Sequence, residues 1–342
     1  MLVTVVRELT EYENIVITLF ENNHFGKELV CDKYYSLNLK MTDFLILPLI
    51  VLRLKKLLKS IDPDLIHTHL YWPTVLTRIA ASRKVPVITT VHAFVSQLVD
   101  YRKWYFRWFY RFTYKLRRTT IIAVAKGALD EYFTFLKLKR NKAFHLYTFV
   151  DTSVYNFSEQ SFKPSGISQV VSVGALRFQK NQIYLLKAFS QLKDNSFKLD
   201  IYGTGPLKNE LESYIKLNSV QNVALKGQVS DIKERLPEYH LFTMSSLYEG
   251  FSLGVLEAMA MKLPLLLSDI PSFREQCGET AVFFDLKNEN DFVTKLNWMK
   301  DHPLEVDAMV SSAELRVKEN FTLTHHMSNL RKIYHEVLTE NR

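Results

Sequence analysis

Two glutamates and two glycines recur at short spacing in the segment Ser245-Ser246-Leu247-Tyr248-Glu249-Gly250-Phe251-Ser252-Leu253-Gly254-Val255-Leu256-Glu257-Ala258-Met259-Ala260. The segment follows a short apolar run typical of a strand and ends in a pattern typical of a helix. Gly250 and Gly254 let a backbone approach a ligand closely. The free N–H groups of the helix N-terminus are expected near Phe251, Ser252 and Leu253. Because such a terminus binds anions, the segment predicts a binding site for a diphosphate.

Both glutamates of this segment have a predicted role beside the diphosphate. Glu257 lies about one helical turn inside the helix, where a carboxylate accepts hydrogen bonds from both hydroxyls of a ribose. Glu249 precedes the helix and is predicted to reach a sugar attached to the diphosphate. The alternative interpretation is an acidic turn followed by a buried helix that binds no ligand.

The rest of the chain alternates between short β-branched runs and helical patterns, which indicates βαβ units and parallel sheets. In the second half, strands are predicted at Gln169–Val173, Lys198–Tyr202, Val223–Leu225, His240–Met244 and Pro264–Leu267. In the first half, they are predicted at Asn14–Leu19, Leu65–His69, Val87–Val91 and Thr120–Val124. Both halves are therefore expected to be α/β domains.

A length of 342 residues fits two such domains. The periodic pattern is interrupted between Asp151 and Ser168, where the composition is typical of a linker. We expect an N-terminal domain over residues 1–160 and a C-terminal domain over 161–320. The apolar pattern from Thr324 to Leu338 predicts a C-terminal helix within 321–342, packing back toward the N-terminal domain.

Over nearly its whole length the sequence resembles retaining glycosyltransferases of the family 4 type, the glycosyl transferases group 1. The resemblance rests on the Glu-x7-Glu motif of Glu249 and Glu257, and on Pro264 and Ser268-Asp269, which follow it as in that family. It implies an α/β fold of the GT-B class, with two Rossmann-like domains whose parallel sheets face a cleft. It also implies a UDP- or GDP-sugar donor on the second domain, a sugar or lipid-linked acceptor on the first, and no metal or further cofactor.

The loop after the predicted strand Gln169–Val173 also resembles this family, in which an Arg directly after a glycine and a Lys five residues later hold the donor diphosphate. Gly174 and Lys180 match the pattern, but Ala175 occupies the Arg position. Arg177 is predicted to substitute from two residues further on, because its planar guanidinium suits a phosphate. The alternative is that Arg177 and Lys180 are solvated loop charges.

Two further loops resemble the nucleotide loops of the family. Gly203 follows the second strand of the C-terminal domain, and Gly227 and Gln228 match the loop beside the nucleobase; uracil and guanine both remain open. The pattern lacks the third glycine of a dinucleotide fingerprint, so no nicotinamide site is expected. The predicted donor-binding residues are Gly174, Gly203, Gly227, Gln228, Gly250, Phe251, Ser252, Leu253 and Glu257.

Three histidines in the first half of the chain are candidate site residues. The family places a histidine against the donor sugar, and His92, at the end of a predicted strand, is the candidate; a structural histidine is the alternative. His67 and His69 alternate on one strand and suit packing or cleft lining, and no third ligand for a metal is apparent. The literal Asp-x-Asp of Asp62–Asp64 is predicted to be a helix stop and turn. The predicted catalytic residues are Glu249, His92, Arg177 and Lys180.

The segment Tyr101–Arg118 interleaves aromatic side chains with seven basic residues. Its basic residues recur three or four apart beside tryptophans, a pattern that suits an anionic membrane surface. The predicted membrane contacts are Lys103, Trp104, Arg107, Trp108 and Arg111. No recognised nucleic-acid module accompanies them, so nucleic acid is not an expected partner. A solvated helix with an aromatic core face is the alternative.

The net charge of +8 is concentrated in residues 1–150, which contain 23 Lys and Arg against 12 Asp and Glu, a balance of +11. Cys31 and Cys277 are isolated, which favours a reducing compartment. The longest apolar run, Phe44–Leu52, is too short to span a bilayer, and no signal peptide is recognisable. We therefore expect a cytoplasmic protein that is peripheral at the inner face of the membrane.

The family normally begins with a strand and a glycine-rich loop, whereas Met1–Tyr12 already matches the helix that follows that loop. We expect the sequence upstream of Met1 to encode about 15–25 further residues with such a strand and loop. Two alternative functions stay open. One is an N-terminally truncated, weakly active protein that binds membrane or partner enzymes; the other is a nucleotide-sugar epimerase of similar fold, which needs no acceptor.

Overall fold

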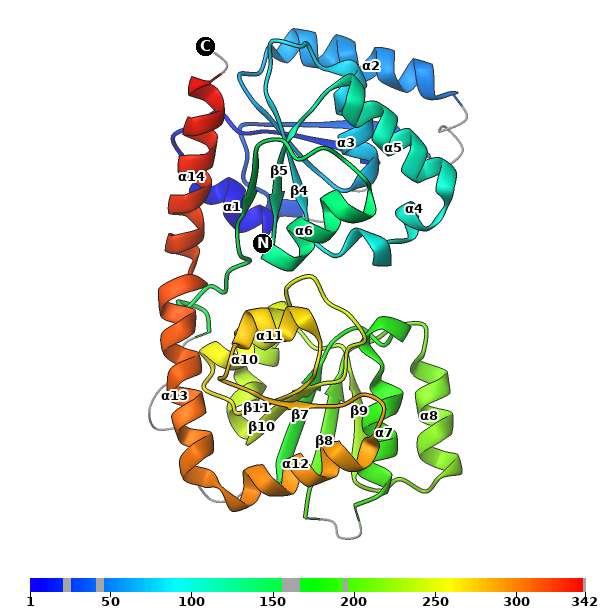
Figure 1. Ribbon diagram of the computed structural model, residues 1–342, viewed down its shortest axis with the longest axis vertical. Helices are drawn as coiled ribbons and strands as arrows, with labels where there is room; N and C mark the ends of the chain where they lie inside the picture. Colours follow the sequence, from blue (N-terminus) through cyan, green and yellow to red (C-terminus); the bar gives the residue numbers. More distant parts are fainter. Residues whose placement is uncertain (21–25, 41–45, 156–166, 193–195, 341–342) are drawn as a thin grey trace. The chain divides into compact units, whose positions relative to one another are not determined.

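The computed structural model describes residues 1–20, 26–40, 46–155, 167–192 and 196–340 (Figure 1). The chain forms two compact units. Unit 1 consists of Met1–Leu146 together with His326–Arg342, and unit 2 of Tyr147–His325. The domain boundary predicted at residue 160 lies outside the described residues.

Unit 1 contains two parallel sheets within the residues described. In one, β1 (Ile15–Phe20) pairs with β2 (Lys33–Leu39); the other has the order β3 (Ile66–His69), β4 (Val87–Val91), β5 (Thr120–Ala123) and β6 (Ala143–His145). The helices of the unit are α1 (Leu2–Glu8), α2 (Leu47–Ile61), α3 (Tyr71–Ala80), α4 (Val99–Arg102), α5 (Trp104–Leu116), α6 (Lys126–Phe135) and most of α14 (Leu323–Thr339). Two short 3-10 turns are η1 (Gly26–Glu28) and η3 (Val95–Gln97).

The amphipathic helix α2 joins the two sheets of unit 1 through one apolar core. Its buried residues Ile50, Leu54 and Leu58 pack in a cluster that also contains side chains from β1, β2, α3 and β4. The helix ends at Asp62, whose backbone is left-handed and whose N–H donates to the Leu58 carbonyl at 3.0 Å. The predicted helix stop at Asp62–Asp64 is thus confirmed.

Among its described residues, unit 2 contains one parallel sheet of six strands in the order β12-β11-β10-β7-β8-β9. Their bounds are β7 (Gln169–Val173), β8 (Lys198–Tyr202), β9 (Val223–Gly227), β10 (Leu241–Met244), β11 (Leu265–Ser268) and β12 (Val282–Phe284). The helices are α7 (Gln182–Ser190), α8 (Lys208–Leu217), α9 (Ile232–Arg235), α10 (Leu253–Ala260), α11 (Pro271–Cys277), α12 (Glu289–Asp301) and α13 (Pro303–Asn320), with η5 (Phe178–Lys180) and η6 (Leu236–Glu238).

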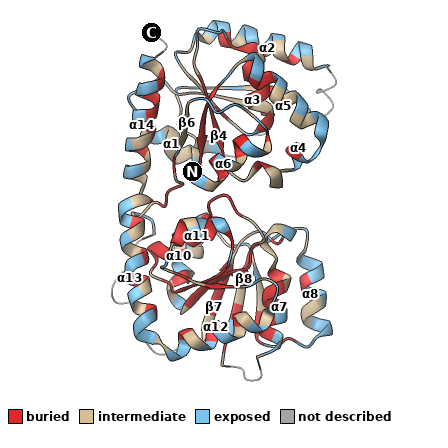
Figure 2. Cartoon of the chain, in the orientation of Figure 1, coloured by how far each residue is buried: buried red, intermediate tan, exposed pale blue. Residues whose placement is uncertain are grey.

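The strand order of unit 2 positions its functional site. Counted from β7, the order is the doubly wound 3-2-1-4-5-6, which reverses direction between β7 and β10. Ligands of such sheets bind outside the carboxyl ends of the strands at this point. The two loops that lead from β7 to Lys180 and from β10 to Glu249 start there. Figure 2 shows the strands as a buried layer between half-exposed helices.

Candidate functional site

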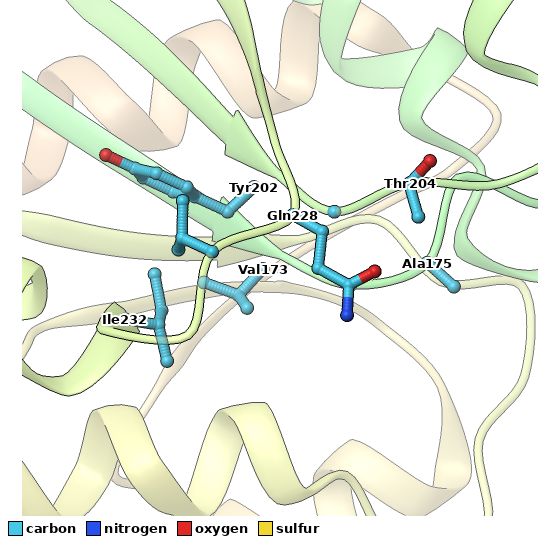
Figure 3. A pocket seen from close by; sticks show the side chains of 9 residues that line it. Val173, Ala175, Tyr202, Thr204, Gln228 and Ile232 are labelled. Carbon is cyan, nitrogen blue, oxygen red and sulfur yellow. The ribbon is translucent and has the colours of Figure 1, made fainter.

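A cavity of about 270 Å³ opens at the carboxyl ends of β7, β8 and β9 (Figure 3). Apolar side chains form much of its wall, and the amide of Gln228 points into it. Three of the predicted donor-binding residues, Gly174, Gly203 and Gln228, line this cavity. The remaining lining residues are Val173, Ala175, Tyr202, Thr204, Val229 and Ile232.

Backbone hydrogen bonds tie the three predicted glycine loops together at this cavity. The Gly174 N–H donates to the Tyr202 carbonyl at 2.9 Å, and the Gly203 N–H donates to the Gly227 carbonyl at 2.8 Å. Gly203 has a φ of +142°, and a Cβ built there would lie 2.0 Å from the Gly174 carbonyl oxygen. Only glycine fits this position, because both the backbone angle and the space exclude a side chain.

Two predicted catalytic residues, Lys180 and Glu249, are in direct contact. The Lys180 ammonium lies 2.7 Å from Glu249 Oε1, and the two side chains are only 13% and 8% exposed. Glu249 also accepts hydrogen bonds from the Ser246 hydroxyl at 2.7 Å and from the Gln179 amide at 3.2 Å. Sequence reasoning missed Ser246 and Gln179, although both lie within segments that it singled out.

The surroundings of Lys180 hold its ammonium beside the cavity. A Cβ added at Gly174 would lie 3.4 Å from the Lys180 Cε, so the lysine side chain runs closely past that glycine. The cation therefore lies between the loop after β7 and the carboxylate of Glu249. Shielding from water strengthens its attraction for an anion.

The N-terminus of α10 differs from the prediction at Ser252. Its N–H is not free, because it donates to the Gln276 side-chain oxygen at 3.0 Å, and the Gln276 amide donates back to the Ser252 carbonyl at 2.8 Å. The prediction that this N–H is available for a phosphate is wrong. Phe251 is buried and its ring packs against Tyr147 and Phe321, whereas Leu253 begins the helix and is exposed.

Glu257 lies inside α10, as predicted, and is half-buried. Burial raises the pKa of its carboxyl, and a hydrogen bond from the Tyr155 hydroxyl opposes this shift. The influence of Tyr155 on Glu257 was not predicted. Arg177, the proposed substitute for the family arginine, is exposed on the loop beside Ala175, which is also exposed.

In unit 1, His92 belongs to a row of three half-buried histidines. The His69 Nδ1 lies 2.9 Å from the His92 Nε2, and the rings of His67 and His69 stack at 4.5 Å. His67 also contacts the Thr90 hydroxyl at 2.6 Å and the Tyr334 hydroxyl at 2.7 Å. Burial lowers the pKa of all three rings, that of His69 to about 3. The His69–His92 pair is therefore neutral near pH 7 and shares a single proton in its hydrogen bond.

The loop that follows His92 is fixed by α6. The two oxygens of Glu131 accept the N–H groups of Val95 and Ser96 at 3.0 and 2.9 Å. Within the described part of the chain, no group of three or more His, Cys, Asp or Glu side chains is arranged to hold a metal.

The predicted membrane segment forms α5, which exposes large aromatic side chains. Trp104 is 71% and Trp108 60% exposed, and the Trp108 ring stacks on the exposed ring of Phe112. Lys103 is exposed, whereas Arg107 and Arg111 are half-buried. None of the helices that the structure describes is long and apolar enough to cross a membrane.

Family models match both halves of the chain. A model described as Glycosyl transferases group 1 matches residues 155–334, which is more than half of the chain, and one described as Glycosyltransferase Family 4 matches residues 2–154. These matches confirm the resemblance inferred from Glu249 and Glu257.

Two bacterial relatives illustrate the similarity. The chain is 27% identical over 285 residues to the N-acetylgalactosamine-N,N'-diacetylbacillosaminyl-diphospho-undecaprenol 4-alpha-N-acetylgalactosaminyltransferase of Campylobacter jejuni, covering 80% of this chain and 77% of that protein. It is 27% identical over 299 residues to the UDP-Gal:alpha-D-GlcNAc-diphosphoundecaprenol alpha-1,3-galactosyltransferase of Escherichia coli, covering 82% and 73%.

Solved structures show the same fold. Anabaena Alr3699/HepE in complex with UDP and glucose matches with a TM-score of 0.82 at 14% identity, over 97% of this chain and 94% of that one. A glycosyltransferase from Rickettsia africae matches with a TM-score of 0.82 at 17% identity, over 98% and 93%. The predicted GT-B fold class is thereby confirmed.

Proposed function

Because the chain belongs to the glycosyl transferases group 1 and is a glycosyltransferase, we propose that it transfers a sugar from a nucleoside diphosphate to a lipid-linked or surface-polysaccharide acceptor, with retention of configuration. The observation that carries the donor assignment is the shielded pair of Lys180 and Glu249, next to a cavity lined by Gly174 and Gly203. A nucleotide in this cavity has its phosphates beside the Lys180 ammonium.

Each residue of this arrangement has a proposed role. Lys180, with Arg177 at the edge of the loop, stabilises the negative charge that develops on the departing diphosphate, as preorganised cations do in other transferases. Glu249 orients the sugar, and Glu257 accepts the ribose hydroxyls. We assign His92 to the donor sugar because the family resemblance places a histidine there. We assign no covalent nucleophile, and propose substitution on the same face of the sugar, as the family resemblance implies.

The acceptor class is proposed from the relatives. Both bacterial transferases described above are named for substrates on a diphospho-undecaprenol carrier. An acceptor of this kind lies in a membrane, so the protein needs a surface that meets lipid. We therefore propose a location at the inner face of the cytoplasmic membrane.

Nucleotide binding is the direct test of the donor assignment. UDP or GDP at 100 times its dissociation constant is expected to stabilise the fold by about 2.7 kcal/mol, because ligand binding to the native state shifts the unfolding equilibrium. Thermal melting with each nucleotide measures this shift. Sugars linked to the nucleotide that stabilises the protein are then tested as donors, with a short-chain lipid diphosphate sugar as the acceptor. NMR of the product reports the anomeric configuration of the new linkage.

Three outcomes of these assays contradict parts of the proposal. If neither UDP nor GDP stabilises the protein, the proposed donor site is wrong. Interconversion of the donor sugar without any acceptor identifies an epimerase instead. If the sugar in the product has the inverted anomeric configuration, the proposed donor site stands but the proposed retention of configuration is wrong.

Two helices of unit 1 support the proposed membrane contact. Besides the aromatic side chains of α5, the first turns of α2 expose Leu49 and Leu52, and the same helix exposes Lys55 and Lys56 further on. Both helices pack beside α3 (Figure 1). Exposed apolar side chains flanked by basic ones match the boundary between acyl chains and anionic headgroups.

Replacing Lys103, Arg107 and Arg111 together by Gln is expected to weaken binding to anionic liposomes about tenfold, since each basic residue near such a surface contributes on the order of 1 kcal/mol and two of these are half-buried. Co-sedimentation with vesicles of phosphatidylglycerol and phosphatidylcholine measures the change. The matched control replaces three exposed lysines of unit 2, Lys187, Lys208 and Lys216, by Gln. Equal losses in the two triple variants mean that net charge, and not this helix, determines binding.

A further inference from the structure

The ring of His92 uses one of its two nitrogens within unit 1. Its Nε2 lies 2.9 Å from the Nδ1 of His69, and the two rings are tilted by 26° with their centroids 5.1 Å apart. Among the residues that the structure describes, no further hydrogen bond reaches either ring. The Nδ1 of His92 is therefore the nitrogen that remains for a ligand.

The pairing of two parallel strands brings these rings together. His69 lies opposite Thr90 in the register of β3 and β4, so both side chains are on the same face of the sheet. Alternate residues of a strand share a face, which adds His67 of β3. His92 comes two residues after Thr90, directly beyond the end of β4 at Val91. The sheet thus places three histidines side by side.

His67 gives this row a fixed end. Its Nδ1 lies 2.7 Å from the Tyr334 hydroxyl of α14, and its Nε2 lies 2.6 Å from the Thr90 hydroxyl. Because both nitrogens are engaged, the ring cannot turn without breaking a hydrogen bond. His69 stacks on this ring at a centroid distance of 4.5 Å, with 28° between the ring planes. The orientation of the His69 ring is therefore set from α14 and β4.

The hydrogen bond between the two imidazoles fixes the tautomer of both. Burial lowers the pKa of each ring, so both are neutral near pH 7. A neutral imidazole has one N–H and one acceptor nitrogen. If His69 donates, the proton of His92 is on Nδ1, and if His69 accepts, the Nδ1 of His92 has the lone pair. In both cases the state of His69 determines what His92 presents at Nδ1.

We propose that His69 is a positioning residue of the transferase, which holds the ring and the tautomer of His92 so that Nδ1, and not Nε2, meets the sugar. The inference rests on the proposed function, since it takes His92 as the residue assigned to the donor sugar. His69 acts through His92 and needs no contact with the substrate. Without the hydrogen bond, the His92 ring is free to adopt other side-chain rotamers, and a fraction of the protein then presents the wrong nitrogen.

Replacing His69 by the two amides tests this role. An Asn amide lies near the position of the imidazole Nδ1, whereas a Gln amide reaches the position of Nε2. His69→Gln is expected to lower the kcat for sugar transfer about three- to tenfold, which is the usual effect of losing a hydrogen bond between neutral groups. His69→Asn is expected to stay within about twofold of the parent. Initial rates with the donor and lipid acceptor of the transfer assay measure both.

Three further measurements separate positioning from general damage. The affinity for bare UDP or GDP, measured by calorimetry, is expected to be parental in both variants, because neither ligand contains the sugar. The 15N chemical shifts of His92 in the labelled free protein need no substrate. They are expected to stay near the parental values in His69→Asn and to move in His69→Gln. Thermal melting of each variant shows whether it folds like the parent.

A ring without nitrogen distinguishes the hydrogen bond from the stacking. Both amide variants lose the ring that stacks on His67, so they differ only in where their polar group lies. His69→Phe keeps an aromatic ring at this place and has no polar group. It is expected to lose as much kcat as His69→Gln.

The His92→Ala background is the control for action through His92. If His69 acts only through that ring, adding His69→Gln to His92→Ala is expected to cause no further loss of kcat. A residue that acts on the substrate or on the fold by itself would cause the same loss in both backgrounds. Initial rates of the parent, the two single variants and the double variant complete the comparison.

Several results would overturn the inference. Parental kcat in His69→Gln and His69→Phe means that the hydrogen bond does not position His92. Equal losses in His69→Asn and His69→Gln mean that a polar group at the place of Nδ1 is not what matters. An undiminished loss in the His92→Ala background means that His69 acts independently of His92.

Failure of the proposed function gives different results. A parental rate in His92→Ala contradicts the assignment of His92 to the sugar, and with it any role of His69 through His92. If the parent transfers no sugar from any donor, the proposed function itself is wrong. Unchanged 15N shifts of His92 in His69→Gln refute the positioning of His92 whether or not transfer is observed.

Discussion

Lys180→Ala is expected to lower the kcat/KM for sugar transfer by about 100- to 1,000-fold, which is the usual effect of removing one preorganised group that stabilises charge in a transition state. The Lys180 side chain is 13% exposed and lies beside the loop after β7, where the diphosphate of the donor is proposed to bind. Leaving-group charge grows as the bond to the sugar breaks, so the loss falls mainly on the transition state. Initial rates at several donor concentrations measure it.

The control for this variant is Lys187→Ala, which removes an exposed lysine from α7. It is expected to keep the parental rate. Lys180→Ala also leaves Glu249 with only Ser246 and Gln179 among the partners described above, so its melting temperature is measured alongside. A folded Lys180→Ala protein with a rate within about threefold of the parent means that Lys180 serves only as the ion-pair partner of Glu249.

The strands of the fold were predictable where they are buried on both faces. The predicted strands Gln169–Val173 and Val87–Val91 coincide with β7 and β4, because runs of β-branched and apolar residues favour the interior of a parallel sheet. The strand β2, Lys33–Leu39, was missed because it contains no β-branched residue, although its burial alternates as in a half-buried strand. Two strands of three residues, β6 and β12, are too short for a periodic signal.

The residues of the candidate site were predictable where a motif lies within a single loop. The spacing of Glu249 and Glu257 and the position of Lys180 after a glycine are local in sequence. The contact between Lys180 and Glu249 depends on two loops that leave neighbouring strands, β7 and β10. Parallel pairing of these strands brings their carboxyl ends together, so this contact follows from the strand order rather than from spacing.

Side-chain partners from distant segments could not be predicted. Gln276 satisfies the Ser252 N–H from α11, 24 residues away, and Tyr155 reaches Glu257 from a segment before the first strand of the sheet. Neither Gln276 nor Tyr155 belongs to a sequence motif whose spacing would identify its partner. Their contacts appear only when the backbone is folded, because a buried polar group takes whichever partner the packing provides.

Glu257→Ala is expected to weaken binding of the stabilising nucleotide by about 10- to 100-fold, since a hydrogen bond to a charged group contributes about 1.5–3 kcal/mol. The pH dependence adds a second measurement. Burial raises the pKa of Glu257, so its carboxylate becomes protonated at a higher pH than an ordinary glutamate. Ribose hydroxyls donate to the charged form, and parental affinity should therefore fall as pH decreases through this raised pKa. Binding by Glu257→Ala should lack that part of the pH dependence.

Glu249→Ala separates the two glutamates. If Glu249 orients the sugar, this variant is expected to bind the bare nucleotide like the parent and to lose mainly the transfer rate, whereas Glu257→Ala loses nucleotide affinity first. Titration of UDP and GDP into both variants, followed by transfer assays at saturating donor, distinguishes the roles. Unchanged nucleotide affinity in Glu257→Ala would contradict the assignment of Glu257 to the ribose. Weaker nucleotide binding in Glu249→Ala than in Glu257→Ala would mean that the roles of the two glutamates are reversed.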